Sequence, residues 1–556
     1  MNEEGLNSPV LGACSVMAKS TSTVLPSAVG HHFWTRSKMK CAFTFLCAMG
    51  LFCIIVYELY NWTSVLEQYE SPHKEVTVDE IMLALSWAAS PANFTSITSS
   101  SSAERSVVRL EHPEAQYCVG DTLSVLVEMK SYAGHPKAHG GDFIQARILS
   151  PKLNAGASGD VTDFLNGSYL VRYRLFWPGE VQVSVRLIHS SETVKLLQRN
   201  WTQDYNKAVH TGTFISGAKK ETSLCSLRLG SDRPLCEYRK KEDGEYYACY
   251  RPKTLPCDTL ALASSVYPRG YPRLTKEEAQ LLDMKNSGIE IKNGFHPVTV
   301  FPCTGATYGS TKKCVAGMNS PFPGGYFFSN RWSSSVCQTG FFLSEYAVTR
   351  CLKGKTLYLL GDSTARQWIE YLEQRLKGMK FTLKGADLQL AVDANNNITI
   401  RWIRHAHPWV ATYQSSVNAS VTIPEALDSI AAVGGGQEDV IVVIGTGQHF
   451  RPSPPEVFIR RLLNIRRAIL RLQARCPQAQ VFIKLENNRD IKLGMIRFSN
   501  WYGYMQNLAQ RKVFEDMRVA LVDAWDMTVA TYSLKLHPDN FIVSNQIAVA
   551  LSFFCD

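Results

Sequence analysis

The chain has 556 residues, of which 45% are hydrophobic and 19% charged, so it is long enough for two domains of ordinary size and has a globular composition. Its formal net charge is +10, but the basic residues are spread along the chain and indicate acidic partners only weakly. The sequence has no zinc-finger spacing, basic arm or RNA-binding motif, which argues against a nucleic-acid partner.

Residues 41–57 are the most apolar stretch. Their sequence, CAFTFLCAMGLFCIIVY, carries no charge and follows Arg36, Lys38 and Lys40. Its length is near the minimum for a bilayer span, and the positive flank predicts that residues 1–40 are a cytosolic leader. We therefore expect a type II signal-anchor with the main body on the lumenal or extracellular side of the membrane. The alternative is a cleaved signal peptide and a secreted protein, although no small-x-small cleavage pattern follows.

Six N-x-S/T sequons follow this segment and none precedes it, which agrees with a lumenal main body. The predicted glycosylation sites are Asn61, Asn93, Asn166, Asn200, Asn397 and Asn418. Eleven cysteines also follow the segment, and they lack the close C-x-x-C pairs of a zinc site. In an oxidising compartment such cysteines form disulfides, and their odd number leaves one thiol free, buried or intermolecular.

Residues 58–104 are predicted to form a stem. This region has a short apolar helix candidate around residues 81–88, followed by TSITSSSSAERS, which has no apolar periodicity and is typical of a flexible spacer.

Residues 105–265 have the pattern of short antiparallel strands. Apolar residues alternate in TLSVLVEM, SYLVRYRLFW and EVQVSVRL, and Asn166-Gly167 and Pro178-Gly179 supply turns. This spacing predicts an immunoglobulin-like antiparallel β-sandwich. A cysteine-rich tail follows at residues 225–257, where disulfides are expected to substitute for a core.

Residues 290–556 have a different pattern, in which apolar runs alternate with amphipathic helical segments. The predicted strands are residues 356–360, 399–403, 440–444, 481–485 and 519–523. Such continuous apolar runs are typical of parallel strands covered on both faces. One predicted helix, residues 458–475, has apolar residues at helical spacing. The alternation predicts a three-layer α/β domain with a parallel sheet.

The strongest local signal for catalysis is GDSTARQW, residues 361–368, where a predicted strand ends and a helix begins. A serine at this turn lies at the carboxyl end of a strand and at a helix N-terminus, where ligands and oxyanions bind. Ser363 is therefore a candidate nucleophile. The alternative is an ordinary helix N-cap made by Asp362 or Ser363.

His537, in LKLHPDN, is the candidate base. It follows the last predicted strand, so its loop returns to the edge of the sheet that carries Ser363. A surface histidine in a turn is the alternative. Residues 404–408 and 444–449 follow two other strands and are candidates for oxyanion donors, and within them Arg404 and His449 are predicted substrate-binding residues. His405-x-His407 has no clear third ligand, so no metal site is predicted.

The chain resembles the neurexophilin-and-PC-esterase (NXPE) family over residues 105–556. The resemblance to its neurexophilin part rests on GGDFIQARI (140–148), NGSYLVRY (166–173) and WPGEVQVSV (177–185). The resemblance to its PC-esterase part, residues 290–556, rests on GGYFFSNRW (324–332), GDSTARQW, VDAWDMT (522–528) and KLHPD (535–539).

This resemblance implies an SGNH/GDSL-like domain that moves an acetyl group onto or off a sugar hydroxyl through an acyl-serine. Ser363 would attack, His537 would transfer the proton, and the N–H groups of Gly447 and Ser363 would hold the oxyanion. Acetyl-CoA is the expected acetyl donor, with no tightly bound cofactor, and the acceptor would be a glycan or glycoprotein, preferentially sialic acid.

The sequence departs from the SGNH pattern at two points. Leu534 stands where an aspartate usually precedes the histidine by three residues, so Asp539, Asp526 or a backbone carbonyl is expected to take that role. The usual asparagine of the third conserved block is also absent, with Thr446 or Gln448 nearby. Loss of the aspartate need not abolish catalysis, because it orients the imidazole and does not accept its proton.

Two other functions remain open. The chain could be a secreted neurexophilin-like protein that binds a cell-surface receptor, with an inactive esterase-like domain. It could also be a carbohydrate O-acetylesterase, which would use the same acyl-enzyme with water as the acceptor.

Overall fold

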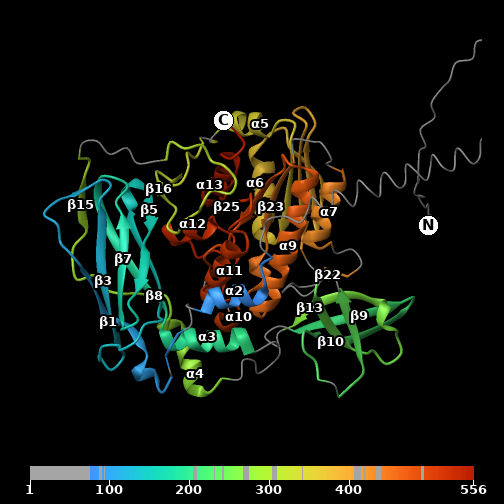
Figure 1. Ribbon diagram of the computed structural model, residues 1–556, viewed down its shortest axis with the longest axis horizontal. Coiled ribbons are helices and arrows are strands. Elements are labelled where there is room, and N and C mark those ends of the chain that lie inside the picture. The colour runs from blue at the N-terminus through green and yellow to red at the C-terminus, as the bar shows by residue number, and fades with distance from the viewer. Residues whose placement is uncertain are drawn as a thin grey trace, which may run out of the picture. The chain divides into compact units, whose positions relative to one another are not determined.

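The computed structural model describes residues 75–556 with gaps (Figure 1). The gaps are residues 87–89, 93, 204–208, 231, 241–242, 267–273, 304–309, 341, 343, 406–414, 418–420, 434–439, 490–493 and 556. The predicted leader, the apolar segment 41–57 and the first part of the predicted stem lie outside the described residues. Within the described part, no helix is long and apolar enough to cross a membrane.

The region predicted to be a spacer is instead ordered structure. Helix α2 (Val78–Leu85) begins with a capping box between Thr77 and Glu80 and buries Ile81 and Leu85. Strand β1 (Ser101–Leu110) begins within the serine-rich stretch, and its first serines are buried. Small side chains without apolar periodicity fit here because β1 pairs with a neighbouring strand, which satisfies its backbone.

Two sheets form a sandwich around one apolar core. The smaller sheet runs β1, β3 (Thr122–Ser131), β7 (Ser168–Arg174) and β6 (Asp160–Asp163). The larger runs β17 (Arg331–Ser334), β16 (Gly325–Phe328), β5 (Ala155–Ser158), β4 (Phe143–Ser150), β8 (Gly179–His189), β15 (Val298–Phe301) and β2 (Tyr117–Cys118). The alternating residues of β3 and β8 are buried in the shared core, as their period of two predicts.

The larger sheet extends across the predicted domain boundary at residue 290. Strands β15, β16 and β17 lie after that residue, yet they pair within the sandwich. These short strands cover edges of the sheet that would otherwise present unpaired backbone groups.

The cysteine-rich tail is a separate sheet. It runs β11 (Leu235–Lys240), β12 (Glu245–Tyr250), β10 (Lys219–Ser226), β9 (Val209–Ser216), β13 (Leu260–Val266) and β22 (Ser415–Ser416). Disulfides Cys225–Cys249 and Cys236–Cys257 hold it, and its core is small, as the sequence predicts. Arg461 of α9 (Pro455–Arg475) forms a bidentate ion pair with Glu245 and ties the sheet to the rest of the chain.

The remaining sheet is mixed and carries the candidate site. Its order is β19 (Lys380–Lys384), β20 (Leu388–Asp393), β21 (Ile398–Arg404), β18 (Thr356–Gly361), β23 (Val440–Gly445), β24 (Gln480–Lys484) and β25 (Ala520–Val522). The last five are parallel, while β19 and β20 form an antiparallel edge.

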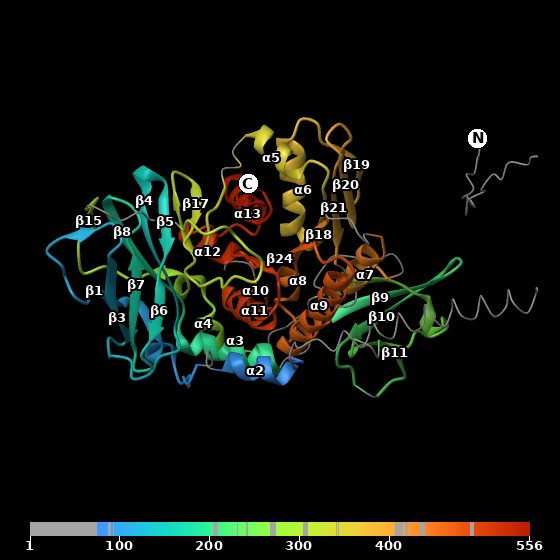
Figure 2. The same cartoon turned by 45° about the horizontal axis from the view of Figure 1, so that its top comes forward.

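Helices cover both faces of this sheet (Figure 2). Alternate residues of β23 point into two different cores, one on each face of the sheet. On one face, Ile441 and Val443 pack with α6 (Ser363–Arg375) and α13 (Asn540–Leu551). On the other, Val442 and Ile444 pack with α7 (Ile423–Val433), α9 and α11 (Asn500–Val513). The described fold is therefore mixed α/β, and this part has the predicted three layers.

Candidate functional site

The carboxyl ends of the central strands meet at one edge of the mixed sheet. Gly361 at the end of β18 lies beside Arg404 of β21 and Gly445 of β23. Gly361 has φ 146°, and a Cβ there would lie 1.8 Å from the Gly445 carbonyl oxygen, so only glycine fits. The tight turn after Gly361 brings Ser363 directly to the start of α6.

Asp362 is the N-cap of α6, and Ser363 is its first residue. The Asp362 carboxylate accepts hydrogen bonds from the N–H and the hydroxyl of Thr364, at 2.8 and 2.7 Å. Within the described residues, the Ser363 N–H makes no hydrogen bond, so it is available at a helix N-terminus, where positive potential favours an oxyanion.

The structure brings Ser363 and His537 together. The Nε2 atom of His537 lies 2.7 Å from the Ser363 Oγ. His537 is in the loop between α12 (Ala524–Ala530) and α13, and Gln367 of α6 holds this loop by donating to the Pro538 carbonyl at 3.2 Å. Burial lowers the pKa of His537, and the positive charge of Arg366 lowers it further, so the ring is neutral and able to accept a proton near neutral pH.

The expectation for Asp539 is not met. Its carboxylate accepts a hydrogen bond from Lys535 at 2.6 Å and is exposed, because Asp539 precedes α13 and faces solvent. Asp526 is buried elsewhere and accepts from the Gly324 N–H at 2.6 Å. No carboxylate in the described part of the chain forms a hydrogen bond with His537.

The expectation for Gly447 is also not met. Its N–H donates to the Glu486 carboxylate at 2.8 Å, and a Cβ at Gly447 would clash with the same carboxylate at 2.4 Å. Only glycine at position 447 leaves room for the Glu486 side chain. Burial, with the nearby negative charge of Asp362, raises the pKa of Glu486 to about 7.

Gln448, which the sequence places among the candidate oxyanion donors and near the missing asparagine, is buried beside Asp362. Its N–H donates to Asp362 at 3.2 Å, and its Oε1 accepts from Arg489 at 3.3 Å. Its buried Nε2 has no hydrogen-bond partner in the described structure. Glu486 and Arg489 come from the segment ENNRD after β24, and their clustered polar side chains after a buried strand were the signal that could have identified them.

The two predicted substrate-binding residues lie at the same edge. Arg404 forms a 2.5 Å ion pair with Asp387. His449, in α8 (Gly447–Phe450), stacks on His405 with ring centroids 4.9 Å apart. Burial lowers the pKa of both histidines, and neither ring nitrogen of His405 has a hydrogen-bond partner within the described residues. His407 lies outside those residues.

A groove of about 750 Å³ opens beside His537. Arg489 and residues 531–537 line it, together with Asp539, Phe541 and Ile542. It gives a ligand access to the base from the side of the loop before α13.

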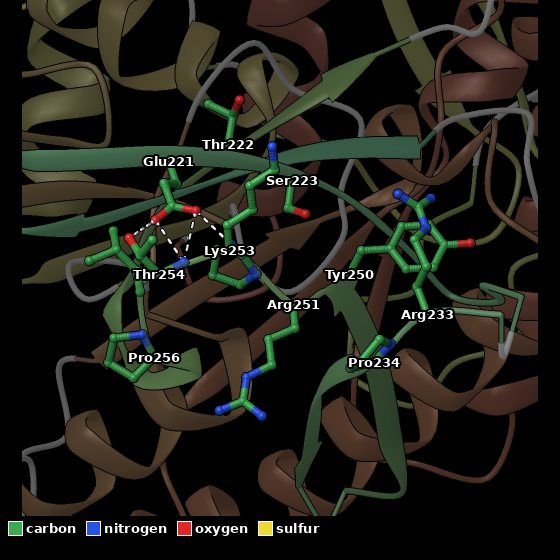
Figure 3. A pocket seen from close by; sticks show the side chains of 12 residues that line it. Glu221, Thr222, Ser223, Arg233, Pro234, Tyr250, Arg251, Lys253, Thr254 and Pro256 are labelled. Carbon is green, nitrogen blue, oxygen red and sulfur yellow. Dashed lines mark hydrogen bonds between the residues drawn. The ribbon is translucent and has the colours of Figure 1, made fainter.

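A separate pocket of about 700 Å³ lies on the cysteine-rich sheet (Figure 3). Glu221 clamps its loop by accepting hydrogen bonds from the N–H groups of Lys253 and Thr254 and from the Thr254 hydroxyl. Figure 3 shows the Arg251 and Lys253 side chains pointing to different sides, so the two cations do not converge on one anion. This pocket contains neither Ser363 nor His537.

The predicted glycosylation sites have different outcomes. Asn166 and Asn397 are exposed in turns. The prediction that Asn200 is an accessible glycosylation site is wrong. Asn200 is buried in α3 (Ser191–Gln203), and its side-chain amide donates to the Leu196 carbonyl at 2.9 Å. Asn61, Asn93 and Asn418 lie outside the described residues.

Two parts of the chain match known families. Residues 94–280 match the family described as Neurexophilin, and residues 332–555 match the one described as NXPE family member 4-like, C-terminal domain. The chain belongs to the NXPE family.

Among solved structures, a match was found to invasin, a bacterial integrin-binding protein. The identity is 10%, the match covers 55% of this chain and 60% of the invasin chain, and the TM-score is 0.13. A likeness this low carries no argument about the NXPE-family chain.

Disulfides agree with the compartment that the neurexophilin match implies. In addition to the two in the cysteine-rich sheet, the structure has Cys118–Cys303, Cys314–Cys337 and Cys351–Cys555. Cys476 is buried and forms no disulfide with another described cysteine, which agrees with the odd thiol predicted from the count. Five disulfides among the described residues of this NXPE-family chain indicate the secretory pathway or secretion.

Proposed function

We propose that this NXPE-family chain is a carbohydrate O-acetyltransferase that works through an acyl-Ser363 intermediate on an SGNH-type α/β domain. The observation that carries the proposal is the 2.7 Å contact between the His537 Nε2 and the Ser363 Oγ. A serine at the start of a helix, within hydrogen-bond reach of a neutral histidine, has the geometry of an activated nucleophile.

In the first half-reaction, the Ser363 Oγ attacks the carbonyl carbon of an acetyl donor while His537 takes the hydroxyl proton. The Ser363 N–H stabilises the oxyanion, whereas the Gly447 N–H already donates to Glu486. His537 then returns its proton to the leaving group, and an acetyl ester remains on Ser363.

In the second half-reaction, a sugar hydroxyl attacks this ester. His537 takes the hydroxyl proton and returns it to Ser363 as the acetylated sugar departs. No aspartate contacts His537 in the described structure, so the imidazolium is less stabilised and we expect a slow enzyme.

The donor and acceptor follow from the family resemblance. We propose acetyl-CoA as donor and sialic acid on a glycoprotein as acceptor, in the Golgi lumen, with residues 41–57 as the membrane anchor.

The neurexophilin match favours a second candidate function. A secreted chain of this kind would bind a cell-surface receptor through residues 94–280, with no need for Ser363. A carbohydrate O-acetylesterase is the third candidate, because water can replace the sugar in the second half-reaction.

The test expresses the full chain in cells and measures O-acetylated sialic acids by mass spectrometry. We expect Ser363→Ala and His537→Ala to abolish the increase that the wild type produces. Ser429→Ala, which removes an exposed hydroxyl on α7, is the matched control and should retain it. Equal O-acetylation from wild type and Ser363→Ala, at equal expression, would refute the proposal. A Ser363-dependent decrease would identify an esterase.

A further inference from the structure

A cavity of about 780 Å³ lies between the sandwich and the mixed α/β part, away from the catalytic pair. Its lining comes from β4 and β6 on one side and from α11 and α12 on the other. Helix α12 packs against β4, and Figure 2 labels all four elements at this junction. The volume is within the range of about 300–1,000 Å³ that ligand sites occupy, and such sites often lie between domains.

Aromatic rings from both parts form a continuous run in this cavity. Phe143 of β4 lies 5.3 Å from Tyr504 of α11, and Tyr504 lies 6.1 Å from Trp525 of α12, measured between ring centroids. Phe143 and Tyr504 are only partly buried, so part of each ring remains uncovered. A surface of this kind packs against the C–H face of a pyranose ring.

The polar groups of the lining suit hydroxyl groups and not anions. Its one cation, Arg511, is ion-paired with Asp523, while Asp160 is exposed and has no partner in the described structure. Negative charge at this rim repels carboxylates, sulfates and phosphates. A carboxylate without a partner can instead accept hydrogen bonds from sugar hydroxyls.

Two further groups have unused hydrogen-bonding capacity. The Tyr504 hydroxyl makes no hydrogen bond within the described residues, and burial raises its pKa to about 12, so it stays protonated as a donor. Gln145 is only 8% exposed, and its Oε1 has no partner there. An unpaired buried acceptor costs free energy unless a ligand satisfies it.

We propose that this cavity binds a neutral oligosaccharide, held by the Phe143–Tyr504–Trp525 run and hydrogen-bonded by Asp160, Tyr504 and Gln145. The proposal does not rest on acyl transfer at Ser363. It assigns the junction of the two parts a role that neither part could perform alone.

The test measures binding of the full chain to immobilised oligosaccharides: neutral galactose- and N-acetylglucosamine-containing chains, and sialylated or sulfated versions of the same chains. We expect the neutral chains to bind and the anionic versions to bind more weakly. Tyr504→Ala and Phe143→Ala should each weaken binding about ten-fold or more, because each removes an apolar contact surface. Tyr504→Phe, which keeps the ring, should lose less.

Ser363→Ala tests whether oligosaccharide binding is independent of acyl transfer. We expect this variant to bind the neutral chains as wild type does. Tyr346→Ala is the matched control, since Tyr346 is 73% exposed on α5 (Glu345–Leu352) outside the cavity. Thermal unfolding of each variant verifies folding. No binding of neutral chains by wild type, stronger binding of the anionic versions, or unchanged binding in both folded Tyr504→Ala and Phe143→Ala would overturn the proposal.

Discussion

Buried charges beneath Ser363 set the shape of the candidate site. Lys484 donates to the Thr364 hydroxyl at 3.0 Å, and Thr364 in turn donates to Asp362. The Glu486 carboxylate accepts a hydrogen bond from the Gly447 N–H. The Lys484–Thr364 contact joins residues 120 positions apart and the Glu486–Gly447 contact joins residues 39 apart. The sequence could therefore predict the glycine and the serine, but not the carboxylate that accepts from the glycine N–H.

The lowered pKa of His537 predicts the acid limit of activity. Since the base must be neutral, the rate should fall only below about pH 6.5, the ordinary value for histidine. Arg366→Gln removes a positive charge that lowers this pKa, so it should shift the acid limb to higher pH. The measurement is the initial rate of acetyl transfer from pH 4.5 to 8, as rough limits for the assay. An acid limb that moves to lower pH in Arg366→Gln would contradict this electrostatic account.

Glu486 predicts a pH dependence of stability. Its pKa is raised from 4.5 to about 7 in the folded chain, so between these values the unfolded state has already lost the proton that the folded state keeps. The contribution of Glu486 to the free energy of unfolding is therefore present below pH 4.5 and is lost as the pH rises to 7.

Glu486→Gln, which cannot ionise, should lose less stability than wild type between about pH 5 and 8. Urea unfolding at both pH values measures the difference. Because all other titrating groups are common to the two proteins, an identical loss in both would show that Glu486 does not titrate in this range.

At the scale of elements, the predicted strands agree with the observed ones. The apolar runs of β18, β21, β23, β24 and β25 were placed within one or two residues, because continuous burial on both faces leaves a plain signal. The Ser363–His537 contact also followed from the order of these strands. Asn200 was misjudged because a sequon does not reveal which face of a helix is buried.

The Cys351–Cys555 disulfide is predicted to stabilise the site through its helices. It joins α5 to the segment after α13, across 204 residues, and α13 follows the His537 loop. Replacing both cysteines by alanine should lower the free energy of unfolding by about 2–5 kcal/mol. Urea unfolding measures this, with Cys476→Ala as the control for loss of a cysteine that has no disulfide. An unchanged midpoint in the double variant would contradict a stabilising role.

At the scale of the molecule, the sandwich and the mixed α/β part depend on one another. Strand β16 belongs to the sandwich sheet, while Arg147 of β4 donates to the Ala530 carbonyl of α12 at 3.2 Å. Ser158 of β5 donates to the Asp526 carbonyl of the same helix. The sequence pattern changed near residue 290, but pattern alone could not show that the chain returns to the first sheet after that point.

A fragment of residues 290–556 should therefore fold poorly by itself. It would expose the face of α12 that packs on β4 and β5, and β16 would lose its pairing with β5. We expect a broad, non-cooperative thermal transition by circular dichroism, compared with a sharp one for residues 75–556. A sharp transition at the same temperature would show that the two parts are independent.

The span of the Cys351–Cys555 disulfide also has a consequence for biosynthesis. Cys555 leaves the ribosome 204 residues after its partner, which corresponds to roughly 10–40 s of translation. Cys476 emerges during that interval, and in the folded chain it is buried and has no disulfide to another described cysteine. Early folding of α9, whose C-terminal end is capped by Cys476, would remove this competing thiol before the correct partner arrives. Early folding of α9 would therefore prevent Cys476 from forming a disulfide with Cys351 before Cys555 is synthesised.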